Sequence, residues 1–138
     1  MSTRFITRTL GYLGLIPFII PAILIATNSG YSDFAIKIVE IYAFGIICFL
    51  TGSWWGMASL NDNRALIFLS NLYFVTAFLL LFLAPLWWSL AASVLLIGIF
   101  ALEQKQSLFP SLPQFYRQMR AVLTVLSSSS MLVIHITR

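Results

Sequence analysis

The chain has 138 residues, of which 60% are hydrophobic and 9% charged, and its mean hydropathy is +0.96. Soluble globular domains carry about 25% charged residues, so this composition excludes an ordinary soluble domain. The length suits one membrane domain and leaves no room for a separate catalytic domain. The net charge of +4 comes from basic residues scattered along the flanks of apolar segments, which favours orientation in a bilayer over nucleic-acid binding.

Five apolar segments separate the charges, and each approaches the about 20 residues that cross a hydrocarbon core of about 30 Å. The predicted fold is therefore an all-α integral membrane bundle of five transmembrane helices, in a single domain covering residues 1–138. In chain order, the expected spans run from about Leu10 to Thr27, Ile38 to Leu60, Ala65 to Leu83, Trp87 to Leu102, and Ala121 to Thr137.

The first span contains Pro17 and Pro21, which predict a kink whose freed carbonyls are met by neighbouring helices. Arg4 and Arg8 before an apolar run also suit a cleavable signal peptide. The run is long for a signal peptide, and no small-x-small cleavage pattern stands near Ala26, so a retained span is the preferred interpretation.

Glycines mark one face of the second span. At about 100° per residue, Gly45, Gly52 and Gly56 fall on the same side, and the last two have the G-x-x-x-G spacing. This spacing favours close packing inside the bundle, with Gly11 and Gly14 of the first span as the expected partners. The alternative is that the glycines make room for a ligand or a partner subunit.

Polar and aromatic residues have expected places in and beside the spans. Asn71 is an amide well inside the third span, and an interhelical hydrogen bond is its expected role. Trp54 is expected to point away from the glycine face near the inner interface. Trp87 and Trp88 are expected in an aromatic belt at the opposite interface.

The fifth span has serines at its centre, residues 127–130. Some of these must face protein or return their hydroxyls to the preceding turn, and the alternative is a helix that lies on the membrane surface. Thr124, Ser128, Met131 and His135 recur at helical spacing, so this mildly polar face is expected to look inward.

The basic residues predict an orientation. Six lie on the side of the N-terminus and two on the other, which places the N-terminus inside and the C-terminus outside. The six are Arg4, Arg8, Arg64, Lys105, Arg117 and Arg120, and the two are Lys37 and Arg138.

Ionisable residues at the outer side form a candidate polar site. Glu40 follows Lys37 at i, i+3 and Arg138 follows His135 at the same spacing, so each pair can interact along its helix. Together with Asn71, Glu40 and His135 are candidates for handling protons or a cation. The alternative is a set of hydrated groups at the interface.

Catalytic and cofactor sites are not expected. The chain has no G-x-S-x-G elbow, no H-E-x-x-H pattern and no phosphate-binding glycine loop. Its lone Cys48 excludes an intrachain disulfide, and its single histidine excludes bis-histidine haem ligation, while mixed ligation with a methionine stays open. The sequence therefore predicts neither an enzyme nor a cofactor or metal site.

The longest connection, from Glu103 to Arg120, is expected on the inner side. It combines aromatic and basic groups beside the membrane, which suits lipid headgroups or a partner surface. The candidate partner-contact residues are Phe109, Phe115, Tyr116, Arg117 and Arg120.

Three blocks of the chain resemble one family. They are Gly11-x-x-Gly14-Leu15-Ile16-Pro17-Phe18, the segment from Tyr42 to Gly56, and Phe115-Tyr116-x-x-x-Arg120-x-x-Leu123-Thr124. They resemble the uncharacterised domain-of-unknown-function family 3429, whose eukaryotic relatives include transmembrane protein 69. The resemblance implies a small multi-pass protein of the bacterial inner membrane, or of the inner membrane of mitochondria, and implies no established activity.

Two functions are consistent with these features. The favoured one is an accessory, assembly or interaction protein of a larger membrane complex, because the chain is small and combines a glycine face with an aromatic and basic loop. The alternative is a small transporter or channel for a proton, ion or small solute. That alternative requires a homo-oligomer, since five short helices enclose little space.

Overall fold

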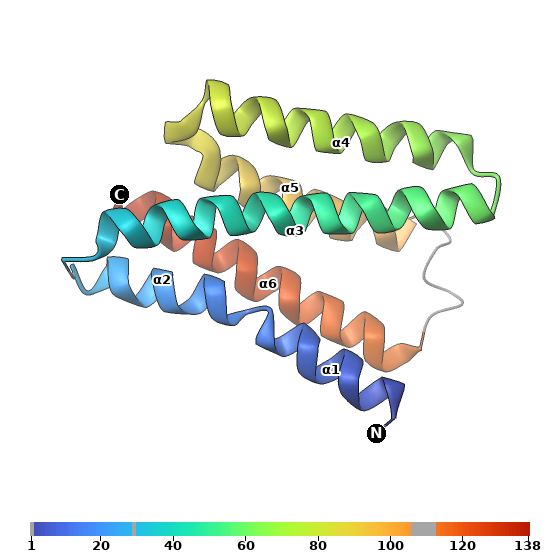
Figure 1. The fold of residues 1–138 in the computed structure, drawn as a ribbon, viewed down its shortest axis with the longest axis horizontal. Helices are drawn as coiled ribbons and strands as arrows, with labels where there is room; N and C mark the ends of the chain where they lie inside the picture. Colours follow the sequence, from blue (N-terminus) through green and yellow to red (C-terminus); the bar gives the residue numbers. More distant parts are fainter. Residues whose placement is uncertain (1, 29, 106–112) are drawn as a thin grey trace.

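The structure, a computed structural model, describes residues 2–28, 30–105 and 113–138. These residues form helices α1 (Thr3–Leu13), α2 (Ile16–Ala26), α3 (Ser32–Leu60), α4 (Arg64–Leu83), the short 3-10 turn η1 (Pro85–Trp87), α5 (Trp88–Lys105) and α6 (Gln114–Thr137) (Figure 1). With α1 and α2 taken together, five helices are long and apolar enough to cross a membrane. The predicted all-α membrane bundle is thereby confirmed.

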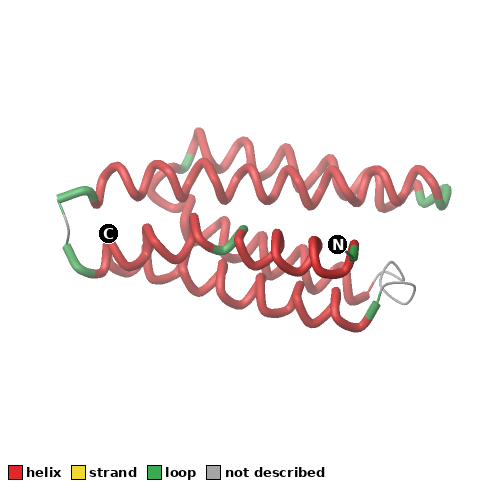
Figure 2. Tube along the Cα trace, turned by 60° about the horizontal axis from the view of Figure 1, so that its bottom comes forward, coloured by secondary structure: helices red, strands yellow, loops and turns green. Residues whose placement is uncertain are grey.

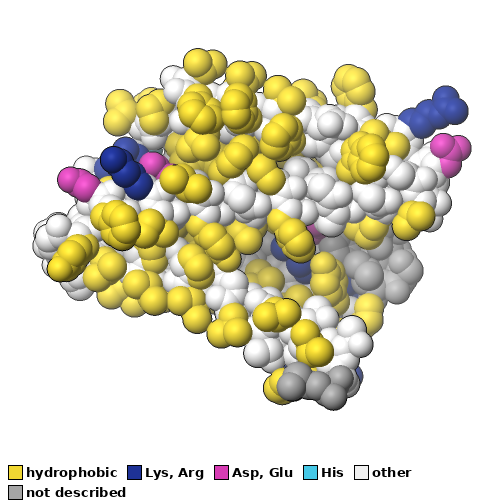
Figure 3. Space-filling model, in the orientation of Figure 1, with side chains coloured by type: hydrophobic (Ala, Val, Ile, Leu, Met, Phe, Trp, Pro, Cys, Tyr) yellow, Lys and Arg dark blue, Asp and Glu magenta, His cyan; other side chains and the backbone are white. Residues whose placement is uncertain are grey.

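The helices run side by side along the long axis of the molecule. Helix α3 packs on α4, α5 packs on α6, and α2 packs against both α3 and α6 (Figures 1 and 2). The two termini lie towards opposite ends of the bundle, as five crossings require (Figure 1). Hydrophobic side chains cover the middle of the visible surface, while charged groups gather near its ends (Figure 3).

The first span is a broken helix, with α1 ending at Leu13 and α2 beginning at Ile16. Pro17 lacks an N–H and its ring clashes with the carbonyl of residue i−4, so the break falls one turn before it. The Gly14 carbonyl, released from the regular helical pattern, accepts a hydrogen bond of 2.9 Å from the Tyr42 hydroxyl of α3. Helix α3 therefore supplies a donor for a carbonyl that the helix break leaves free, as the two prolines predicted.

Helices α5 and α6 are longer than the apolar segments that predicted them. Helix α5 continues to Lys105 and α6 begins at Gln114, so Glu103 and Arg120 lie on helices and not in the inner connection. The longer helices bring these two charged side chains together across the interface between α5 and α6. Phe109, one of the expected partner-contact residues, lies outside the described residues.

Single-cysteine labelling tests the topology. In a Cys48→Ala background, a reagent that does not cross membranes should label Ser2→Cys and Asn61→Cys from one side and Gly30→Cys from the other. These positions lie at the ends of successive spans, and a side chain at Gly30 meets no atom within 4 Å. Labelling of Asn61→Cys and Gly30→Cys from the same side would contradict the fold.

Candidate functional site

A buried ion pair connects α5 and α6 near the end of the bundle that holds the N-terminus. The Arg120 Nη2 atom lies 2.8 Å from Glu103 Oε2, and the two side chains are 8% and 4% exposed. The indole Nε1 of Trp54, on α3, donates to the other carboxylate oxygen at 3.0 Å. One carboxylate therefore joins three helices.

The buried carboxylate of Glu103 needs the counter-charge and hydrogen bonds that surround it. A carboxylate that leaves water loses several kcal/mol of solvation, which only a well-placed counter-charge and hydrogen bonds offset. Here each oxygen of Glu103 has its own donor. Trp54 is fully buried and packs edge-on against Tyr73, with 5.8 Å between ring centroids. Trp54 points away from the glycine face, as predicted, but the expected place of its indole at the membrane interface was wrong, because its N–H is bonded in the core.

A second ion pair lies at the opposite end of the bundle. Arg138 Nη1 is 2.7 Å from Glu40 Oε1, and the side chains are 30% and 13% exposed. Trp88 is fully buried and donates its indole N–H to the Glu40 carbonyl at 3.1 Å, so it belongs to the core and not to an aromatic belt. Glu40 thus pairs across the bundle with the chain end, whereas Lys37, its expected partner, is exposed.

His135 lies at the same end with different partners. Its Nδ1 is 3.2 Å from the Ser89 hydroxyl of α5, and its ring lies 5.7 Å from the Trp87 ring between centroids. The structure therefore brings Glu40 and His135 to one end of the bundle but gives each its own contacts. Among the described residues, no three His, Cys, Asp or Glu side chains gather as a metal site would require.

Small polar groups lie along part of the contact of α5 with α6. The Ser93 hydroxyl donates to the Ser128 carbonyl at 3.1 Å, and Ser127 returns its hydroxyl to the Leu123 carbonyl at 2.7 Å. Thr124, Ser128 and Met131 are buried, as an inward-looking face requires. Within the described part of the chain, the buried Ser128 hydroxyl has no hydrogen-bond partner.

The glycines of α3 do not pack inside the bundle. Gly45, Gly52 and Gly56 are exposed, and a side chain at any of them would meet no atom within 4 Å. The prediction that they contact the first span was wrong, because α3 buries its opposite side. The buried residues of that side include Val39, Ala43, Ile47, Leu50, Trp54 and Ala58.

The first-span glycines face other neighbours. A Cβ atom at Gly11 would stand 2.6 Å from the Met119 sulfur, so this glycine allows close approach of α1 to α6. A Cβ atom at Gly14 would stand 3.5 Å from the Tyr42 hydroxyl, beside the hydrogen bond that satisfies the helix break. Both glycines are therefore packing positions, but not against the glycines of α3.

Asn71 is exposed on α4, and its amide nitrogen donates to the Ile67 carbonyl of the same helix at 2.9 Å. The predicted interhelical hydrogen bond was wrong. The buried stripe of α4 includes Leu66, Ser70 and Ala77, and Asn71 lies about 100° around the helix from Ser70. The amide consequently points out of the bundle.

The aromatic and basic residues that were expected on the inner side divide into two groups. Phe115 is half-buried beneath the Arg4 guanidinium, whose carbon lies 4.6 Å from the ring centroid, and Tyr116 is also half-buried. Arg117 is exposed. Arg120 is buried in the ion pair, so its expected role on a partner-facing loop was wrong.

Sequence reasoning missed Glu103, although a signal was present. Glu103 continues the buried stripe of α5 through Leu96 and Ile99, at spacings of three and four residues. A carboxylate on the same helix face as buried apolar residues predicts a basic side chain buried beside it. The assignment of Glu103 to the connection after the fourth span concealed this pattern.

The two ion pairs should differ strongly in their contribution to stability. Glu103→Gln leaves a buried guanidinium without its counter-charge, so we expect the free energy of unfolding to fall by about 3–5 kcal/mol. Glu40→Gln, at the more exposed pair, should cost about 1 kcal/mol or less. Equilibrium unfolding of both variants in mixed micelles gives the comparison, and equal losses would contradict the assignment.

The hydrogen bond from Trp54 can be tested separately. Trp54→Phe keeps an aromatic ring but removes the N–H that Glu103 accepts, so it should destabilise the protein by about 1–3 kcal/mol. Trp55→Phe is the matched control, because Trp55 is 52% exposed and a change there should stay within about 0.5 kcal/mol. Similar unfolding curves for the two variants would count against the bond.

Comparison with known proteins places the chain in a family. The family model described as "Protein of unknown function (DUF3429)" matches residues 3–136. No curated protein and no solved structure is significantly similar. Since the matched segment covers nearly the whole sequence, and the blocks quoted from the sequence fall within it, the chain belongs to the DUF3429 family.

Proposed function

We propose that this protein is an accessory, assembly or interaction component of a larger membrane complex, and that it receives a transmembrane helix of its partner on the outward face of α3. The observation that carries this proposal is a row of three exposed glycines on a helix whose other exposed residues include bulky apolar side chains. Gly45, Gly52 and Gly56 form this row, which we call the glycine groove.

The composition of the glycine groove suits helix docking in lipid. Helices in a bilayer associate mainly through close van der Waals packing, and small residues with G-x-x-x-G spacing permit that approach. Bulky exposed side chains border the groove on the same helix, among them Ile41, Phe49 and Trp55. A helix laid along the three glycines would contact these walls and the α3 backbone together.

The position of Asn71 supports helix docking on the same surface. Across the contact of Trp54 with Tyr73, Asn71 lies two residues before Tyr73, and Gly52 and Gly56 lie two residues to either side of Trp54. Asn71 also shares the side of α4 that carries Phe78, which contacts α3. An exposed amide in hydrocarbon is costly, and a hydrogen bond to a docked helix would offset that cost.

The transport alternative has weaker support. Its candidate residues do not share one route, because Asn71 points outward on α4 while Glu40 and His135 lie at one end of the bundle. The buried side chains of Leu96 and Ile99 also interrupt the polar groups between α5 and α6. An interaction role accounts for the exposed glycines and Asn71, and it does not require a continuous polar route across the membrane.

We place the protein in the bacterial inner membrane, or in the inner membrane of mitochondria in a eukaryote, with its N-terminus inside. The excess of basic residues at the end that holds the N-terminus supports this orientation. The family resemblance supports the choice of membrane. The inner side then offers Arg117, exposed at the start of α6, to the partner or to lipid headgroups.

Replacement of a groove glycine tests the proposal. Gly52→Leu should reduce co-purification of the partner from native membranes about tenfold or more, because its side chain fills the groove. The fold should be unaffected, since the new side chain meets no atom of the bundle within 4 Å at its Cβ. Gentle detergent extraction and quantitative mass spectrometry measure the recovered partner, which is either another protein or a second copy.

Ala101→Leu is the matched control, because Ala101 is a small exposed residue on α5, away from the groove. Its partner recovery should equal that of the unchanged protein. Equal recovery from Gly52→Leu and Ala101→Leu, or purification of the unchanged protein as a monomer without a stoichiometric partner, would refute the interaction role.

A further inference from the structure

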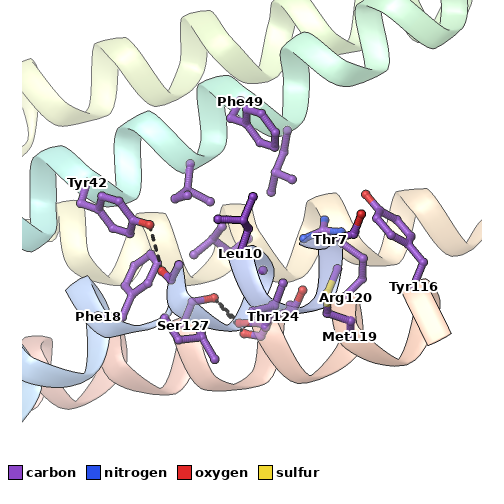
Figure 4. A pocket seen from close by; sticks show the side chains of 17 residues that line it. Thr7, Leu10, Phe18, Tyr42, Phe49, Tyr116, Met119, Arg120, Thr124 and Ser127 are labelled. Atoms are coloured by element: carbon purple, nitrogen blue, oxygen red, sulfur yellow. Dashed lines mark hydrogen bonds between the residues drawn. The ribbon is translucent and has the colours of Figure 1, made fainter. Parts of the chain in front are cut away.

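A cavity of about 490 Å³ lies between α1, α3, α5 and α6, and Phe49, which borders the glycine groove, also lines this cavity. Its volume falls within the about 300–1,000 Å³ typical of small-molecule sites. Figure 4 shows the labelled side chains around it, with Thr7, Tyr116 and Arg120 at one end and Phe18 and Tyr42 at the other. The cavity thus extends along the bundle axis.

The lining changes character along this length. Between the two ends, apolar side chains such as Leu10, Phe49 and Leu123 dominate. The end near the N-terminus instead presents the Thr7 hydroxyl and the Arg120 guanidinium, which is held in place by Glu103. An apolar channel with a cationic group at its interfacial end matches a molecule with a polar head and an apolar chain.

Charge at this end favours an anionic head. Arg4 and Arg8 of α1 and Arg117 of α6 are exposed there. The acidic residues of this end are Asp62, in the turn between α3 and α4, and Glu103, which is already paired. The balance is therefore strongly positive where an anion would lie.

The cavity is also reachable from the bilayer. Helix α1 packs on α6, and Thr7 and Leu10 of α1 lie across the space from Phe49 of α3 (Figure 4). In the space-filling view a hollow opens below α3, with basic side-chain atoms at its floor (Figure 3). A chain from the surrounding lipid can enter here without crossing the bundle.

We propose that this cavity binds an anionic phospholipid of the bilayer. One acyl chain lies along Leu10, Phe49 and Phe18, and the phosphate is at the end formed by Thr7, Tyr116 and Arg120. The planar guanidinium of Arg120 has five N–H donors and suits a phosphate diester geometrically, while Glu103 holds its orientation. The second acyl chain stays in the bilayer.

The test uses the delipidated protein in a neutral detergent, with native mass spectrometry to count bound lipid. The probes are phosphatidylglycerol and phosphatidylcholine with identical acyl chains, and inorganic phosphate as competitor. The anionic lipid should bind at least about tenfold more tightly than the zwitterionic one. Inorganic phosphate should not displace it, because the chain contributes to binding.

Thr7→Phe should then lower the affinity for phosphatidylglycerol about tenfold by filling the polar end of the cavity. The Thr7 hydroxyl bonds the Thr3 carbonyl of its own helix, so no contact between helices is lost. Thr9→Phe, at an exposed position of the same helix, is the control and should bind as the unchanged protein does.

Equal affinity for the two lipids would overturn the proposal, and so would displacement of the lipid by inorganic phosphate alone. Unchanged binding to Thr7→Phe would also overturn it. The comparison of the two lipids uses the unchanged protein, so it tests anionic lipid binding even where a variant folds poorly. Each of these outcomes is measured on the purified protein without a partner, so failure of this inference can be distinguished from failure of the proposed function.

Discussion

The ion pair between Glu103 and Arg120 is the constraint on which the arrangement of the bundle depends. Two charges with little exposure must stay together, so α5 and α6 have a fixed register at this end. The Trp54 indole must then reach the same carboxylate, which sets the rotation of α3. Gly52 and Gly56 stand two residues to either side of Trp54, about 200° around the helix, and so face outward. The hydrogen bond that Glu103 accepts from Trp54 in the core thereby places the glycine groove at the surface.

The two ends of the bundle use charge differently. Near the N-terminus, the pair is enclosed and both carboxylate oxygens have donors, so its loss exposes a buried charge to an apolar environment. At the opposite end, Glu40 and Arg138 are partly exposed and water shares their solvation, so the pair contributes less. Arg120 also lines the cavity, which joins the structural cluster to the proposed lipid site. The end of the bundle near the N-terminus therefore holds both the more stabilising ion pair and the proposed lipid site.

The fold could be predicted from sequence because a bilayer requires long apolar helices with satisfied backbones, and charges then mark the connections. The rotation of each helix could not be predicted in the same way. Lipid-facing and protein-facing residues are both apolar, so hydrophobic periodicity does not show which side of α3 is buried. Glycine spacing was equally compatible with an inward or an outward face, and Asn71 with either side of α4. The hydrogen bond from Trp54 to Glu103 fixes the rotation of α3, and the cluster forms only when α3, α5 and α6 are all in place.

The central claim is that the Trp54–Glu103–Arg120 cluster turns the glycines of α3 towards lipid. Nitroxide labels placed one at a time along residues 45–58 in liposomes, with oxygen accessibility measured at each position, test it most directly. The account predicts accessibility maxima at Gly45, Gly52 and Gly56 and minima at Ile47, Trp54 and Ala58. The proposed partner is absent from such liposomes, so the glycine groove should be open to oxygen. Minima at the three glycines, with maxima at the residues now assigned to the core, would contradict it.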